Sequence, residues 1–358
     1  MRQILIAAML FAACANGDSA DQQQATNTDT TKNAANKTTA AVATSNTGVA
    51  VTEAGDTLAP NELGRIPILE YHIIGDKNSL YGRERGQFRK DLELVYKLGY
   101  RPVNITDVLD KKLDLPRGQS PVVFVFDDAS PEQFSYIERN GQLEIDPTTG
   151  LGIWQDFQKT HSDWSNKSTY CVLSGAEAGH AFFGDKNIHG QKNEWRFKKL
   201  KYLADQGYEI CNHTLWHAQL SKYPDAFVQE QIARLQLAVD SAVPGYKIRT
   251  LALPQGLWPK NKTLAHKGSW TDPKSGKTIS YNYESILEVA GGPTRSPHDP
   301  QFNGFSMTRV QATGKEIENA LARLDKTRTR YVSDGDPSTV AKPTQSVAQQ
   351  TTAPQPKQ

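Results

Sequence analysis

From residue 65 onward, short apolar runs alternate with longer segments in which apolar residues recur every three or four positions. The short runs are rich in β-branched and aromatic residues, and they predict strands at 65–74, 101–105, 121–126, 168–173, 208–212 and 248–254. The periodic segments predict helices at 87–98, 194–206, 226–243 and 314–326. The run at 121–126 is apolar throughout, which is typical of a strand that is buried on both faces.

Repeated alternation of strands and helices predicts an α/β fold built on a parallel sheet or barrel. The segment from 63 to 332 is close to the ~250 residues of a typical closed β/α barrel. We therefore expect one folded domain over 63–332. In parallel sheets and barrels the chemistry lies at the carboxyl ends of the strands.

The two flanks have a different composition. Residues 15–62 are rich in Thr, Asn, Ala, Gln and Asp and contain almost no large apolar side chains, and residues 333–358 are similar. Such segments bury too little apolar surface to offset the entropy of ordering. We expect a disordered tether before the domain and a disordered tail after it.

Residues 1–14, "MRQILIAAMLFAAC", predict an export signal, with a basic start, an apolar core and small residues before a cysteine. The ending "FAAC" resembles a bacterial lipobox, in which Cys14 becomes the acylated N-terminus. The alternative is an ordinary cleaved signal that is discarded together with Cys14. We expect an exported protein, either a membrane-anchored lipoprotein or a periplasmic or extracellular protein.

Charge and cysteine content limit the partners. The formal net charge is +2 and basic residues are interleaved with acidic ones, which argues against a nucleic-acid partner. Contact with a membrane is expected only through Cys14, and we expect a monomer. Cys171 and Cys211 lie in separate apolar runs. They could pair after export or remain buried free thiols.

Polar side chains cluster where the predicted strands end. His213 and His217 follow the run 208–212, and Asp127 and Asp128 follow the run 121–126. Two histidines four apart are common metal ligands, but such a pair alone is more often solvated. Because the carboxyl ends of parallel strands meet at one rim, the four residues, together with His72 and the turn at 254–256, are expected to share a pocket.

The same stretches resemble a known family. "VVFVFDDAS", "EICNHTLWHAQL" and "LALPQG" resemble, in this order, the first three motifs of the polysaccharide deacetylases, carbohydrate esterase family 4 with the NodB homology domain. "IPILEYHII" resembles the opening strand of that family. The resemblance spans about residues 66 to 325 and implies a distorted (β/α) barrel as a single catalytic domain.

The resemblance also implies a divalent metal, most often Zn²⁺, with Co²⁺ or Ni²⁺ as alternatives. Its ligands would be Asp128, His213 and His217, and Asp127 would be the general base for a metal-bound water nucleophile. Three protein ligands leave a coordination position open, which is typical of catalytic zinc. The turn of Pro254, Gln255 and Gly256 would line the acetyl pocket.

Three departures from the family pattern bear on the mechanism. Ala252 lies where an Arg that orients the base is typical, and Ala129 lies where a Gly commonly follows the two aspartates. Residues 314–332 contain no histidine, so the usual Leu-x-His general acid is missing. His72 is the candidate to replace it. The alternatives are that His72 only forms a hydrogen bond, and that Asp127 or the metal-bound water returns the proton.

The resemblance therefore predicts a metal-dependent hydrolase of carbon–nitrogen bonds other than peptide bonds. It would remove N-acetyl groups from an acetylated cell-wall or extracellular polysaccharide, or from peptidoglycan. Two alternatives stay open, a catalytically impaired relative that binds glycan and an esterase that removes O-acetyl groups. The long connection at 130–168 carries four aromatic residues that could stack on sugars, although packing within the connection is the simpler role for them: Phe134, Tyr136, Trp154 and Trp164.

Overall fold

The computed structural model describes residues 58–175, 181–184 and 187–343. The predicted export signal, the acylated Cys14, most of the tether and the end of the tail lie outside the described residues. Those expectations, including export and the lipid anchor, stay predictions. No helix in the described part of the chain is both long and apolar enough to cross a lipid bilayer.

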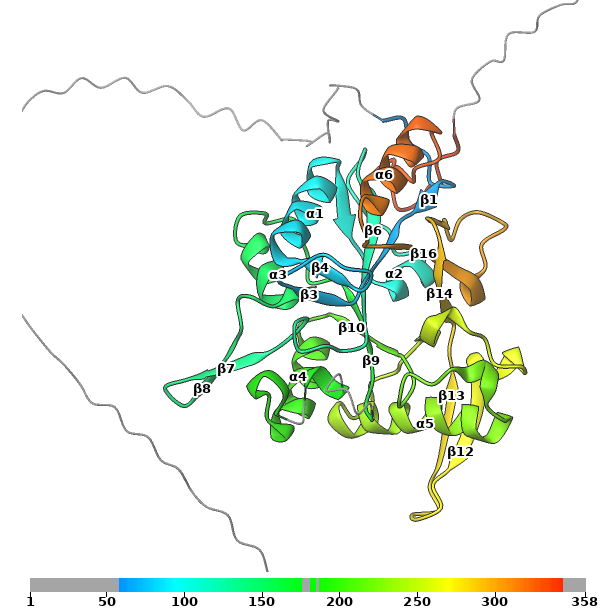
Figure 1. Ribbon diagram of the computed structural model, residues 1–358. Helices are drawn as coiled ribbons and strands as arrows, with labels where there is room; N and C mark the ends of the chain where they lie inside the picture. The colour runs from blue at the N-terminus through cyan, green and yellow to red at the C-terminus, as the bar shows by residue number, and fades with distance from the viewer. Residues whose placement is uncertain (1–57, 176–180, 185–186, 344–358) are drawn as a thin grey trace, which may run out of the picture. The chain divides into compact units, whose positions relative to one another are not determined.

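Seven parallel strands close into a barrel, as predicted (Figure 1). Around the ring their order is β2, β16, β14, β11, β10, β9 and β6, and β6 pairs with β2 to close it. The strands of the ring are β2 (Ile68–Tyr71), β6 (Ser120–Asp127), β9 (Thr169–Val172), β10 (Glu209–Asn212), β11 (Thr250–Ala252), β14 (Ser285–Gly291) and β16 (Met307–Gln311). A further strand, β5 (Tyr100–Pro102), pairs with β6 outside the ring.

Helices lie outside the barrel in Figure 1. They are α1 (Arg85–Lys97), α2 (Ile105–Leu109), α3 (Gly150–Gln158), α4 (Arg196–Asp205), α5 (Asp225–Ala242) and α6 (Glu316–Lys326). The carboxylate of Glu84 accepts hydrogen bonds from two backbone N–H groups in the first turn of α1, which satisfies donors that a helix start leaves unpaired. Phe88, Leu92 and Val95 of α1 are buried, in agreement with the predicted apolar face.

Shorter strands form separate pairs. They are β1 (Arg65–Ile66) with β15 (Thr294–Arg295), β3 (Ile73–Gly75) with β4 (Gly82–Glu84), β7 (Tyr136–Arg139) with β8 (Gln142–Ile145), and β12 (Lys267–Thr271) with β13 (Thr278–Asn282). The apolar run 65–74 is therefore not one strand, because it is shared among β1, β2 and β3. The hairpin of β12 and β13 packs against α5.

The connection at 130–168 holds the hairpin of β7 and β8 and helix α3. Its four aromatic side chains are buried in the large cluster between barrel and helices, so they pack inside the protein and do not form a sugar platform. Trp154 and Trp164, for example, contact Phe124 of β6 with ring centroids 5.1 Å and 5.8 Å apart.

Side chains along each barrel strand alternate between two apolar clusters. One cluster lies between strands and helices and includes Phe124 and Phe126. The other fills the barrel interior and includes Val123, Val125, Cys171 and Cys211. Because β6 serves both clusters, its residues 121–126 are apolar on both faces.

Cys171 and Cys211 form a disulfide in the barrel interior. They are register partners on β9 and β10, and both are fully buried. Of the two possibilities for these residues, the structure has the bonded one. Disulfides persist in oxidising compartments, and export of this protein stays a prediction.

The packed domain extends beyond the expected boundaries of 63 and 332 by a few residues on each side. Asn61 pairs with Val332 through two backbone hydrogen bonds. Glu62 is buried and accepts hydrogen bonds from the backbone N–H groups of Asp334 and Ala341. The polar composition of these segments concealed this packing, because backbone pairing needs no apolar side chains.

Removing the disulfide should destabilise the protein without changing its fold. The two cysteines are 40 residues apart, and a closed loop of that length contributes about 4 kcal/mol in the chain-entropy model. The Cys171→Ala/Cys211→Ala variant should therefore unfold at lower denaturant concentration than the wild type, measured by fluorescence at equilibrium. Because the bond is buried, reductant should leave the folded wild type oxidised. It should lower the denaturant midpoint of the wild type only through molecules that have unfolded and exposed the bond. Equal free energies of unfolding would contradict this expectation.

Candidate active site

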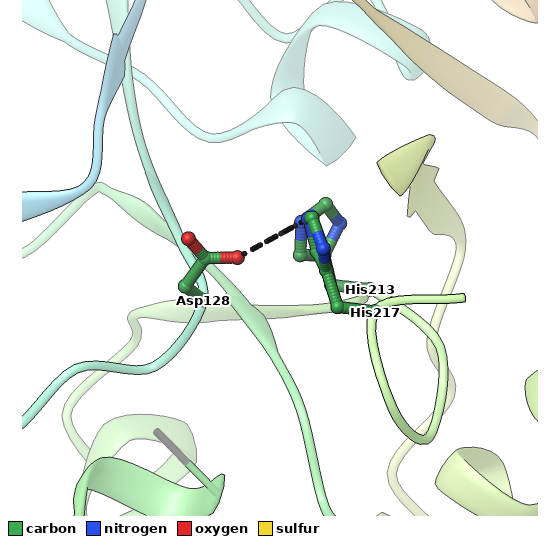
Figure 2. Close-up of side chains that lie close together, drawn as sticks. All are labelled: Asp128, His213 and His217. Atoms are coloured by element: carbon green, nitrogen blue, oxygen red, sulfur yellow. Dashed lines mark ion pairs between the residues drawn. The ribbon is translucent and has the colours of Figure 1, made fainter. Parts of the chain in front are cut away.

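The predicted metal ligands meet at the carboxyl ends of β6 and β10 (Figure 2). Nε2 of His213 lies 3.3 Å from Oδ1 of Asp128, and Nε2 of His217 lies 3.6 Å from the same oxygen. One ligand atom from each residue lies within 4.8 Å of the other two. The three side chains come from two segments that are far apart in sequence, so the barrel assembles the group.

The backbone bends sharply at these residues. Asp128 has φ 75° and His217 has φ 59°, values that residues other than glycine seldom adopt. Ala129 has φ 50°, and it lies where the family resemblance leads one to expect a glycine. Such conformations cost of order 1–3 kcal/mol each and are found mainly where function requires them. Because the backbone bends at Asp128, the two adjacent aspartates have different surroundings. Asp127 is fully buried, whereas Asp128 is only partly buried.

The ring of His213 is oriented by a backbone carbonyl group on β11. Its Nδ1 lies 2.9 Å from the carbonyl oxygen of Ala252, so Nδ1 carries the hydrogen and donates it in the neutral ring. Nε2 then presents its lone pair toward Asp128. Among the described residues, neither this Nε2 nor Oδ1 of Asp128 has a hydrogen-bond partner, although both atoms are buried.

These observations fit a bound divalent metal. Buried polar atoms without partners are costly, and a cation between them would satisfy both. Two imidazoles and one carboxylate with an open position form the donor set of catalytic zinc. The ring of His217 does not need to be oriented by a backbone carbonyl as the ring of His213 is. Its side chain is partly exposed and can turn toward the ion.

Charge and burial set the protonation of the three ligands in the metal-free protein. Burial lowers the pKa of His217, and the nearby His213 lowers it further, to about 4. Burial also acts to lower the pKa of His213, but the charges of Asp127 and Asp128 outweigh it and leave this pKa raised. Burial disfavours ionised Asp128, yet the adjacent histidines keep its pKa below the ordinary value. Of the two histidine ligands, His213 is therefore the one whose protonated form is favoured by its surroundings in the metal-free protein.

The predicted base, Asp127, is held by an arginine that the sequence did not reveal. Nη1 of Arg309, on β16, lies 3.0 Å and 2.9 Å from the two carboxylate oxygens of Asp127. Nη2 of Arg309 lies 3.1 Å from Oε1 of Glu70, on β2. Burial opposes ionisation of Asp127, but the charges of Arg309 and His213 prevail and lower its pKa.

The missing arginine of the third motif therefore has a counterpart on another strand. Ala252 contributes only its methyl group to the barrel interior and its carbonyl to His213. Arg309 and Glu70 were not predicted as site residues, because each is a single charged residue in a short strand. The available signal was their spacing, since Glu70 is two positions from both Ile68 and His72 and so shares their face of the strand.

His72 lies beside the base. Its Nε2 is 3.7 Å from Oε1 of Glu70, and ligand atoms of His72, Glu70 and Asp127 fall within 4.8 Å of one another. The ring of Tyr81 packs edge-on against it, with centroids 5.3 Å apart. Burial lowers the pKa of His72 more than the charge of Asp127 raises it. The neutral imidazole therefore predominates at neutral pH.

The turn at 254–256 is joined to the ligand loop. Pro254, Gln255 and Gly256 form a single 3₁₀ turn directly after β11, and Gln255 has φ 57°. The amide of Gln219, two residues after His217, donates a hydrogen bond to the side-chain oxygen of Gln255. Gln255 is exposed, so it is available to a ligand, and the predicted contact of this turn with an acetyl group stays a prediction.

Part of this chain is similar to known proteins. Residues 164–268 match the family model "Polysaccharide deacetylase". The "Chitooligosaccharide deacetylase" of Bradyrhizobium sp. (strain ANU 289) is 29% identical over 62 residues, and that of Sinorhizobium fredii (strain NBRC 101917 / NGR234) is 30% identical over 59 residues. These matches cover 17% and 16% of this chain and only 28% and 27% of the two relatives.

A solved structure shares the fold. "Streptococcus pyogenes deacetylase PplD in complex with acetate" superposes with a TM-score of 0.50 at 17% sequence identity, covering 72% of this chain and 97% of that one. At this identity the likeness concerns the barrel alone. The family model and the curated relatives thus match part of this chain, and the solved structure shares its barrel.

Proposed function

We propose that this protein is a metal-dependent hydrolase that removes N-acetyl groups from a glycan. The observation that carries the proposal is the group of Asp128, His213 and His217 next to the buried carboxylate of Asp127. One carboxylate for the metal and a second one for the proton is the division of labour that amide hydrolysis needs. When bound, a divalent ion would supply Lewis acidity that polarises the acetyl carbonyl and promotes ionisation of water.

The residues of the chain then account for the proton transfers. Asp127 accepts one proton from the attacking water while the water oxygen bonds to the acetyl carbon. The carbon–nitrogen bond breaks, and the amine nitrogen takes up a proton as it leaves. The products are acetate and a glycan with a free amine. Arg309 keeps Asp127 ionised before the reaction, as a base must be.

His72 is the proposed source of the proton for the amine. Its position next to Asp127 lets it reach the same bond from the side of β2. Because burial lowers its pKa, only a minority of the protein carries the imidazolium at neutral pH. An enzyme that depends on this form should therefore work best in acid solution. The alternative is that Asp127 returns the proton that it accepted.

The substrate class follows from the relatives. Two of them are named chitooligosaccharide deacetylases, so we propose an N-acetylated sugar polymer, including peptidoglycan, as substrate. A second candidate is O-deacetylation, which is favoured by the lack of a histidine at 314–332, because an ester has a better leaving group than an amide. Acetate release from N-acetylglucosamine oligomers, compared with release from acetylated xylan, separates the two. Binding of either glycan without acetate release would indicate an impaired relative.

The metal-free protein should bind one Zn²⁺ ion, more tightly as the pH rises. His213 has a raised pKa and has to lose its proton before Nε2 can bind, so affinity should increase through a pH range above 6.5. His217, with a pKa of about 4, is already neutral there and adds no dependence. Titration calorimetry after chelation measures both effects.

Alanine in place of Asp128, His213 or His217 should abolish stoichiometric Zn²⁺ binding, because two protein ligands remain. The variant His298→Ala is the matched control, since this histidine lies against Tyr331 at the opposite end of the barrel. Full metal content in His217→Ala would refute the ligand assignment.

The variant Asp127→Asn should retain the metal and lose most of its activity. Removal of a general base typically costs ~10²–10⁴-fold in rate. The amide keeps one oxygen for Arg309, so the fold should persist. Acetate release and metal content are measured on the same sample. If Asp127→Asn loses the metal while Asp128→Asn keeps it, the two roles are exchanged.

The variant His72→Ala tests the proton donor. An acid is active in its protonated form, so activity should fall as the pH rises through the pKa of His72, below 6.5. His72→Ala should lower the rate and remove that fall from the pH–rate profile, with metal content unchanged. A wild-type rate and profile in His72→Ala would leave the returning proton with Asp127 or the metal-bound water.

A further inference from the structure

Two aromatic side chains at the active-site end of the barrel are exposed to solvent. Trp216 is 47% exposed and lies between the two histidine ligands, in the loop after β10. Tyr81 is 58% exposed and directly precedes β4, in the segment that follows β2. Neither ring has a part in the proton transfers proposed above. Exposed apolar side chains beside a site are typical of ligand-binding surfaces, so the two rings indicate a ligand.

The two rings belong to opposite sides of the barrel mouth. Tyr81 is carried on the side of β2 and Trp216 on the side of β10. In the closed ring of seven strands, β2 and β10 are separated by β6 and β9 in one direction and by β16, β14 and β11 in the other. No two strands of a seven-stranded ring are farther apart. A ligand that contacts both rings therefore has to cross the mouth.

A path of contacts through the catalytic groups joins the two rings. The ring of Tyr81 contacts His72, with centroids 5.3 Å apart, and ligand atoms of His72 and Asp127 lie within 4.8 Å of each other. The rings of the two histidine ligands follow, with centroids 4.9 Å apart, and Trp216 directly precedes the second of them. The reacting groups thus lie between the two aromatic rings. A single pyranose at the metal group cannot lie on both rings.

The indole of Trp216 is fixed by its neighbours. Its backbone N–H donates to the side-chain oxygen of Gln231 at 3.1 Å, and its ring contacts that of Phe227 with centroids 5.9 Å apart. The indole also packs against the backbone of Gly175, where a Cβ atom would lie 2.5 Å from two indole atoms. A glycine at this position therefore makes room for the ring. A ring that is already ordered loses little conformational entropy when a ligand binds.

We propose that Trp216 and Tyr81 each stack on a sugar unit, one on either side of the acetylated unit at the metal group. The inference rests on the proposed function and deepens it, because it makes internal units of a glycan chain the substrate. The axial C–H groups of a pyranose form an apolar face that fits a flat aromatic ring. The side-chain amides of Gln219 and Gln255 lie between the ligand loop and the turn after β11, and each keeps polar atoms for sugar hydroxyl groups.

The polarity of the surface between the rings favours a sugar chain over a lipid surface. Aspartate and histidine side chains occupy the path from one ring to the other. A lipid surface is bound by a continuous apolar face that is rimmed by basic residues. A glycan instead alternates apolar ring faces with polar hydroxyl and acetamide groups, and so matches two apolar rings separated by a polar centre.

The first test measures binding without catalysis. The probe is a pentamer of N-acetylglucosamine, titrated into the metal-free protein by calorimetry. Trp216→Ala and Tyr81→Ala should each weaken its binding about 10-fold, through the loss of one stacked ring. The two losses should add in the double variant, because the rings contact different sugar units. Trp216→Phe should keep most of the affinity. Phe305→Ala is the matched control and should bind as the wild type does, since Phe305 is 42% exposed but lies directly before β16, at the opposite end of the barrel.

The second test locates the first acetyl group that the metal-loaded enzyme removes from the same pentamer. Mass spectrometry of short reactions should show that it comes from an internal unit. Trp216→Ala should raise KM for the pentamer about 10-fold, with metal content unchanged.

Unchanged pentamer affinity in both alanine variants, or first removal from a terminal unit, would overturn the inference. Loss of binding to anionic phospholipid vesicles in Trp216→Ala, with unchanged pentamer affinity, would overturn it in favour of a lipid surface. A wild type that binds the pentamer through both rings and releases no acetate would refute only the proposed function.

Discussion

The pairing of β2 with β6 is the constraint on which the rest of this molecule depends. It joins the first strand of the ring to the second one in sequence and turns an open parallel sheet into a closed barrel. Closure removes both free edges and forces every inward side chain to find partners in the interior. It also places the ends of β2, β6 and β10 around one opening, where Asp128 and His213 can approach each other. An open sheet would leave Glu70 of β2 and Asp127 of β6 on distant edges.

The interior of the barrel is layered by polarity. Near the amino ends of the strands, Glu209 accepts hydrogen bonds from the hydroxyl groups of Thr169 and Thr250 and from the backbone N–H of Thr106. The disulfide and its apolar neighbours follow, and the group of Asp127, Glu70 and Arg309 forms the upper layer. The apolar middle layer lowers the local dielectric, so the charges above it interact more strongly than they would in water. Burial raises the pKa of Glu209 to about 7, because no cation lies beside it to offset the loss of hydration.

Sequence patterns predicted the barrel and the proximity of Asp128, His213 and His217, because motif and periodicity are properties of short segments. His213 and Asp128 follow apolar strands that are recognisable by themselves. The strands β14 and β16 were not predicted, since "SILEVAG" and "MTRVQ" mix polar and apolar residues in short runs. Arg309 was missed for the same reason. Its partner lies 182 residues away, and only the closed ring shows that the two side chains face each other.

The location of the disulfide has a consequence for biogenesis. Both sulfur atoms belong to the sealed middle layer of the barrel, with no exposed surface on either cysteine. An oxidant of protein size cannot reach them after the ring has closed, so the bond has to form while β9 and β10 are adjacent and the remaining strands are still unassembled. A protein-sized oxidant would therefore have to act before the barrel closes. If the barrel closed before oxidation, both thiols would stay reduced and buried. Such an oxidant could then reach them only after the protein unfolds.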